Sequence, residues 1–161
     1  MLSHGRIAMS WTLRSLTLVL SLCAGVALTG DLCFAHGYRI KSLEILHPAI
    51  AVPKPGSSET CAYVTIVNHG KVAERLRGLR TSVSDKSQII RLSDDGLSQP
   101  EFSEIVIRPG ERLDLRQAGW CLLLSGLRVQ LEADVGAFPG SLIFEQAGEI
   151  RVEFMCDTYG Q

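Results

Sequence analysis

Short runs with β-strand character, separated by turn residues, constrain the fold of this chain more than any other feature. Beyond residue 36 such runs follow one another closely, and no long helical period appears. The clearest run is "CAYVTIVNHG", residues 61–70, in which Tyr, Val, Thr and Ile favour a pleated surface and Asn-His-Gly predicts a turn. We predict further strands at residues 38–45, 75–79, 87–92, 103–107, 111–115, 121–124, 141–145 and 148–154. This spacing predicts an all-β domain, either an antiparallel sandwich or a barrel.

Turn and breaker residues indicate how the strands connect. The segments "RPGE" at 108–111 and "QAGE" at 146–149 are expected to form hairpin turns between neighbouring strands. An extended loop is predicted after the first strand, because four breakers follow it: Pro48, Pro53, Pro55 and Gly56. The 161 residues contain no internal repeat and no low-complexity linker, so we expect a single β domain.

The first 35 residues have the composition of a secretory signal. Basic residues precede an apolar run at 16–22, continued by 23–28, which is too short to span a bilayer comfortably. We predict a signal peptide at 1–35, cleaved after Ala35 or, as a second choice, after Ala27, and a mature domain at 36–161 without a membrane span. An uncleaved membrane anchor is the alternative. No small residue precedes Cys23 or Cys33 as a lipoprotein signal requires, so we expect no lipid anchor.

Three cysteines remain after cleavage at Ala35: Cys61, Cys121 and Cys156. In an oxidising compartment this odd number allows one internal disulfide and one free thiol, and it leaves the pairing open. No Cys-x-x-Cys is present, which argues against a zinc knuckle and a thioredoxin-like motif. Some of these cysteines are expected to be small buried apolar residues.

The chain carries no recognisable catalytic motif. It lacks Gly-x-Ser-x-Gly, His-Glu-x-x-His and a glycine-rich phosphate loop, so we expect that it is not an enzyme. The formal net charge of −1 argues against a nucleic-acid partner. Of the histidines in the mature chain, His69 is expected in a turn and His47 in a loop. His36 would become the first residue, where its imidazole and α-amine could chelate copper or stay solvated.

Five segments, taken in order, resemble the periplasmic copper chaperones called PCu(A)C: "AHGYRIKSLEILHP", "CAYVTIVNHG", "ERLRGL", "IVIRPGERLDLRQAGWCLLLSGL" and "SLIFEQAGEIRVEF". The resemblance covers essentially the whole mature chain. It implies a cupredoxin-like β-barrel, a periplasmic location, and copper as the bound cargo. It also implies a partner that accepts copper in the periplasm, such as an oxidase assembly factor.

The resemblance also identifies the positions of the family's copper ligands, a His and a Met from one segment and a His-x-Met pair from another. These positions correspond to Ser93, Gln99, Cys121 and Leu123 in this chain, so the usual His/Met ligands are not retained. A thiolate is a soft ligand for Cu(I), which makes Cys121 the first candidate metal ligand and His36 the second. We expect Cys121 to be partly exposed at the barrel mouth, near His36, rather than disulfide-bonded.

Three functions follow from these observations. The first is copper binding or delivery through a degenerate site rebuilt around Cys121. The second is a non-metal interaction module that keeps the barrel and binds no copper. The third is a thiol redox protein that uses Cys121 with Cys61 or Cys156.

Overall fold

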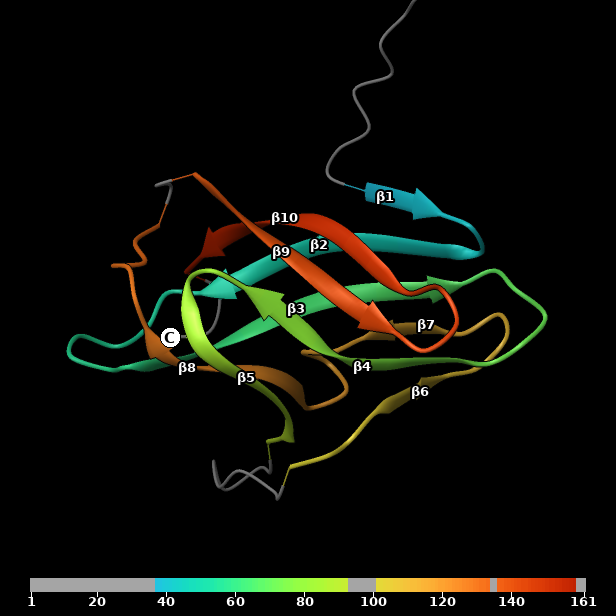
Figure 1. Ribbon diagram of the computed structural model, residues 1–161, viewed down its shortest axis with the longest axis horizontal. Coiled ribbons are helices and arrows are strands. Elements are labelled where there is room, and N and C mark those ends of the chain that lie inside the picture. Colours follow the sequence, from blue (N-terminus) through green and yellow to red (C-terminus); the bar gives the residue numbers. More distant parts are fainter. Residues whose placement is uncertain (1–36, 93–100, 134–135, 159–161) are drawn as a thin grey trace, which may run out of the picture. The chain divides into compact units, whose positions relative to one another are not determined.

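The computed structural model describes residues 37–92, 101–133 and 136–158, and these residues form ten strands and no helix. Figure 1 shows their arrangement. The strands, in chain order, are β1 (Gly37–Ile40), β2 (Leu43–Ala51), β3 (Glu59–Asn68), β4 (Glu74–Thr81), β5 (Ser84–Arg91), β6 (Ile105–Ile107), β7 (Arg112–Asp114), β8 (Trp120–Leu127), β9 (Ala137–Phe144) and β10 (Glu149–Asp157). The all-β fold predicted from the strand pattern is therefore confirmed.

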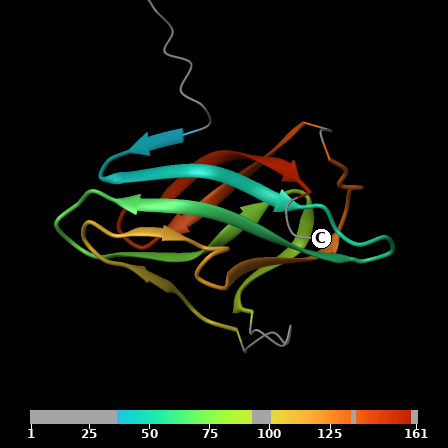
Figure 2. The same cartoon turned by 180° about the vertical axis from the view of Figure 1, so that it is seen from behind.

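The strands form one sheet that curls into a nearly closed barrel. Its order is β5-β8-β3-β2-β10-β9-β4-β6, with β1 paired to β2 and β7 paired to β3. Figures 1 and 2 show the same curled arrangement from opposite sides. The predicted antiparallel pairing holds for every pair of strands except one, because β10 runs parallel to β2 over Met155–Asp157. These two strands lie at opposite ends of the domain sequence, so no hairpin signal could indicate how they pair.

Strand β2 continues through a position where a loop was expected. The strand runs from Leu43 to Ala51, although Pro48 lies within it. His47 adopts a left-handed conformation with φ of 50°, and the register with β3 shifts between Leu46 and Ala49. Such a bulge interrupts the ladder, so the missing N–H of a proline is tolerated there. The predicted loop therefore begins only after Ala51.

The two predicted turns differ in what they connect. The "QAGE" turn joins β9 to β10 as a hairpin, with Phe144 N donating to Gly148 O at 2.9 Å. The "RPGE" segment also forms a turn, in which Glu111 N donates to Arg108 O at 3.0 Å. However, β6 pairs with β4 and β7 pairs with β3, so this turn crosses between strands that are not neighbours. The expectation of a hairpin at residues 108–111 was wrong.

The barrel interior is filled by the inward face of each strand. In β10 burial alternates strictly, so that Ile150, Val152, Phe154 and Cys156 point inward while their neighbours face solvent. This period-two pattern is the one expected of a strand with one buried face. The side chain of Phe154 fills the space beside Gly140, where an added Cβ would lie 2.8 Å from Cε2 of the Phe154 ring. Burial of each large apolar side chain stabilises the fold by roughly 1.5–3 kcal/mol.

Buried polar side chains fix the turns at one end of the barrel. Asn68, which is 1% exposed, donates from Nδ2 to the carbonyls of Val72 and Ile107, and its Oδ1 accepts from Gly70 N. The Glu74 carboxylate accepts hydrogen bonds from three backbone N–H groups, those of Arg75, Gln146 and Ala147. A buried polar group needs such partners, because leaving it unpaired costs free energy.

Candidate functional site

The segment "GWCLLLSGL", to which the resemblance assigns half of the copper ligands, forms strand β8. The chain enters β8 through Gly119, whose φ of 75° favours glycine and whose O accepts from Leu92 N at 2.8 Å. Within β8, Leu122 and Leu124 point into the main core, whereas Cys121 and Leu123 lie on the opposite face. Cys121 is nevertheless fully buried, at 0% exposure, and its ladder partner on β5, Ile90, is buried as well.

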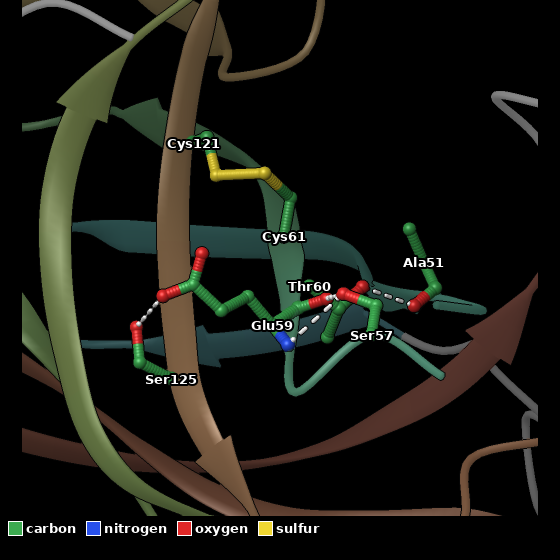
Figure 3. The surroundings of a disulfide bond; sticks show 7 residues. All are labelled: Ala51, Ser57, Glu59, Thr60, Cys61, Cys121 and Ser125. Atoms are coloured by element: carbon green, nitrogen blue, oxygen red, sulfur yellow. Dashed lines mark hydrogen bonds between the residues drawn. A yellow bond between two sulfur atoms is a disulfide. The ribbon is translucent and has the colours of Figure 1, made fainter. Parts of the chain in front are cut away.

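Cys121 forms a disulfide with Cys61 of β3 (Figure 3). The S–S distance is 2.03 Å, the two Cα atoms are 5.5 Å apart, and the residues are separated by 60 positions in sequence. The expectation of a partly exposed, unpaired Cys121 was therefore wrong. Its physical cause is the pairing of β3 with β8, which brings Cys61 beside Cys121 although nothing in the sequence links the two. Cys61 itself is partly exposed.

The third cysteine, Cys156, is free and buried on the inner face of β10. Burial raises the pKa of its thiol, because a low-dielectric surrounding disfavours the thiolate. The three cysteines thus form one disulfide and leave one free thiol, within the limit of at most one internal disulfide that their odd number sets.

Most of the other predicted ligand positions cannot be compared with the fold. His36, Ser93 and Gln99 lie outside the described residues. Leu123 is described, and its alkyl side chain is half-buried on β8, opposite Cys61 in the ladder. Within residues 37–92, 101–133 and 136–158, no three His, Cys, Asp or Glu side chains come together as a metal-binding group. With Cys121 held in a disulfide, the described residues therefore do not fit copper in the family's manner.

Aromatic and cationic side chains surround the start of β8. The ring of Trp120 meets that of Phe102 edge to face, with centroids 4.9 Å apart. The guanidinium of Arg91 lies 5.3 Å from the centroid of the Trp120 ring on the paired strand β5. Such edge-to-face and cation–π contacts are favourable, so they fix the orientation of Trp120 directly beside Cys121.

The two described histidines have structural positions, one with side-chain and backbone partners and one in a bulge. The backbone N of His69 donates to Ser42 O at 2.8 Å, and its Nε2 lies 2.7 Å from Oε2 of Glu44. The hydrogen bond from His69 is the main reason that the pKa of Glu44 is lowered from 4.5. His69 thus ties the end of β3 to the β1–β2 turn, as expected of a turn histidine, whereas His47 sits in the β2 bulge instead of the loop that was expected.

A cavity next to the β2 bulge was not foreseen from the sequence. It has a volume of about 300 Å³, and its lining includes His47, Tyr63, Thr65, Asp114 and Arg116. Thr65 Oγ1 donates to Oδ2 of Asp114 at 3.1 Å, and the Arg116 guanidinium lies 4.4 Å from the centroid of the Tyr63 ring. Burial raises the pKa of Tyr63. These residues come from β2, β3, β7 and the segment after β7, and no motif connects them.

Comparison with known proteins identifies the fold. A family model described as "Putative lipoprotein LpqE-like" matches residues 43–156, most of the chain. None of the curated proteins matches the chain. The part of the chain that the structure describes contains no helix long and apolar enough to cross a membrane.

Several solved structures share the architecture. "Copper-bound PCuAC domain from PmoF2" has a TM-score of 0.65 at 21% identity and covers 76% of this chain and 97% of its own. "Apo PCuAC domain from PmoF1" has a TM-score of 0.65 at 22% identity and covers 76% and 98%. "Solution structure of CuI-DR1885 from Deinococcus Radiodurans" has a TM-score of 0.61 at 17% identity and covers 79% and 84%. At these identities the likeness shows the fold.

The family match and the structural likeness agree with the resemblance found in the sequence segments. The chain therefore belongs to the LpqE-like family, a PCuAC-type family, and has the cupredoxin-like fold of the PCuAC copper chaperones.

Proposed function

We propose that this protein is an exported copper chaperone-like protein that binds copper and delivers it to an acceptor protein in the periplasm. One observation carries the proposal: Cys121, which stands at a position that the resemblance assigns to a copper ligand, is bonded to Cys61, and the ladder partner of Cys61 is Leu123, the second such position on this strand. Sulfur is the donor that Cu(I) prefers. Two cysteine sulfurs in place of a His and a Met would therefore change the type of ligand and still offer Cu(I) soft donors. The role is one of binding and transfer, without a catalysed reaction.

Export and cleavage belong to the same proposal. Cleavage after Ala35 would leave His36 as the first residue, with an α-amine and an imidazole that can bind copper. The mature domain would then be 36–161. Mass spectrometry of the protein from the periplasmic fraction should show a chain that begins at His36 and carries no lipid. A chain that retains Met1, or a lipid on Cys23 or Cys33, would contradict this part of the proposal.

Copper transfer is the decisive test of the function. The mature protein is reduced, loaded with one equivalent of Cu(I) against a chromophoric chelator, separated from free copper, and mixed with an apo acceptor such as an oxidase assembly factor. We expect copper to bind with one-to-one stoichiometry and to move to the acceptor, as measured by metal analysis of the separated proteins. Absence of Cu(I) binding in both the reduced and the oxidised protein would refute the proposal.

A second candidate is a non-metal interaction module in the periplasm. It is favoured by the complete burial of Cys121 in a disulfide and by the alkyl side chain of Leu123, neither of which offers copper a ligand in this state. In this case the barrel would bind a partner protein through its surface. The copper measurement separates the two candidates, because the interaction module binds no copper in either redox state.

A further inference from the structure

We infer that Cys61 and Cys121 form a redox-controlled Cu(I) site, which binds copper as a pair of thiolates and is closed when the disulfide forms. The inference rests on the proposed function and specifies its site. It differs from the family's arrangement in both ligand chemistry and strand origin, since one sulfur comes from β3 and the other from β8.

The register of β3 and β8 gives the geometric basis. In this ladder the partner of Leu123 is Cys61, and the ladder continues to the pair Ala62 and Leu122. Residues 121 and 123 share one face of β8, and cross-strand partners project from the same face of the sheet. Cys61 therefore presents its sulfur from the neighbouring strand at the level of Leu123, the position that the resemblance assigns to the family's Met. The second soft donor is displaced across the ladder rather than lost.

Contacts that do not involve the disulfide hold both cysteines in place (Figure 3). Ser125 Oγ donates to Oε1 of Glu59 at 3.0 Å, which links β8 to β3 directly beside the cysteines. Thr60 Oγ1 donates to Ala51 O at 2.5 Å and ties the same end of β3 to β2. On its other side β8 pairs with β5 along its whole length. Reduction therefore leaves two thiols on anchored neighbouring strands, whose Cα atoms lie 5.5 Å apart in the disulfide form.

The difference in burial between the two sulfurs defines how the bond can be opened. Cys61 is partly exposed and Cys121 is fully buried, so the thiolate of a dithiol reductant can reach Sγ of Cys61. A new S–S bond forms between the reductant and Cys61, the Cys61–Cys121 bond breaks, and its electron pair stays on Cys121 Sγ, which takes up a proton. The second thiol of the reductant then displaces Cys61 as a thiol. The protein gains two electrons and two protons, and the reductant becomes a disulfide.

The reduced pair of cysteines, Cys61 and Cys121, suits Cu(I) better than Zn²⁺. Cu(I) is satisfied by two soft thiolates, and its binding displaces the two thiol protons. A structural Zn²⁺ requires four ligands, and no group of three or more His, Cys, Asp or Glu among the described residues is arranged to hold a metal ion. An oxidant of the disulfide class reverses the sequence: it removes two electrons from the thiolates, restores the Cys61–Cys121 bond and releases Cu(I).

The test compares Cu(I) affinity in defined redox states. Oxidised and reduced mature protein are titrated with Cu(I) against a chromophoric Cu(I) chelator, together with the reduced variants Cys61→Ser, Cys121→Ser and Cys156→Ser. We expect one Cu(I) in the reduced wild type, none in the oxidised form, and affinity lower by roughly 100-fold or more in Cys61→Ser and Cys121→Ser. Cys156→Ser is the matched control and should bind as the wild type does, because Cys156 lies on the inner face of a different strand.

Two readouts on the wild type keep the test independent of variant folding. X-ray absorption of the Cu(I) form should show two sulfur neighbours, and one equivalent of Cu(I) should protect Cys61 from alkylation. Cu(I) binding that is equal in both redox states, or that persists without change in folded Cys61→Ser and Cys121→Ser, would overturn the inference and leave the proposed function standing. Absence of binding in every form would overturn both.

Discussion

Removal of the Cys61–Cys121 disulfide should lower the stability of the barrel without changing its fold. The bridge spans 60 residues of sequence, and the loss of loop-closure entropy in the unfolded chain gives a stabilisation of about 4 kcal/mol for a loop of that length. This value is an upper bound, because a compact unfolded state has less entropy to lose. The variant Cys61→Ala/Cys121→Ala should therefore unfold more easily than the oxidised wild type, and Cys156→Ala shows what loss of a buried sulfur costs by itself.

Urea unfolding followed by tryptophan fluorescence measures this effect. The two tryptophans of the chain are Trp11, in the predicted signal peptide, and Trp120, so fluorescence of the mature domain reports on the residue beside Cys121. With a slope of about 2 kcal/mol per M urea, a loss of about 4 kcal/mol moves the midpoint down by about 2 M. Far-ultraviolet circular dichroism should keep the β signature at low urea. An unchanged midpoint in the double variant would refute the reasoning, since the bridge would then place no constraint on the unfolded chain.

Other side chains allow further tests of the fold. Asn68→Ala should lose roughly 2–4 kcal/mol of unfolding free energy, measured in urea, because one buried and two partly buried backbone groups lose their partner, whereas a neutral result would mean that water replaces the amide. Phe154→Ala should lose about 3–5 kcal/mol by creating a cavity, and a smaller loss would show that the barrel collapses around the site. The pKa of Glu145 is lowered from 4.5, mainly by the hydrogen bond from Arg75. A carboxyl whose pKa is lower in the folded than in the unfolded protein stabilises the fold at any pH above its pKa in the unfolded protein. This stabilisation is lost as the pH falls through its pKa in the folded protein. The melting temperature of the wild type should therefore drop more on acidification below about pH 4 than that of Glu145→Gln, and equal drops would contradict the ion pair.

The strands were predictable where the local pattern was strong. Residues 61–70 were predicted as a strand that ends at Asn-His-Gly, and β3 ends at Asn68. The start of β9 was missed, because Pro139 and Gly140 suggest a break. The ladder between β4 and β9 ends at the pair Thr81 and Gly140, so Pro139 needs no N–H on that side. The ring of Phe154 occupies the space beside Gly140, which explains why a residue without a Cβ lies within this strand.

The candidate site was predictable only in part. The resemblance led to Cys121 and Leu123, and the count of cysteines allowed at most one internal disulfide. The disulfide partner of Cys121 was not predictable, because the pairing depends on the register of two strands whose cysteines lie 60 residues apart in sequence. Short-range patterns determine which residues share a face of one strand, whereas the neighbour across the sheet depends on the packing of the whole barrel.

The parallel pairing of β2 with β10 has a consequence for the order of folding. The last strand of the domain, β10, lies between β2 and β9, which belong to opposite ends of the domain sequence. Until residues 149–157 have emerged, β2 and β9 each lack a neighbour, and the inward side chains of β10 are missing from the interior. Contacts at such long sequence separation form slowly, because a large loop must close first. We therefore expect the barrel to close only when synthesis of the domain is complete, which would keep the chain unfolded for passage through a membrane if it is exported.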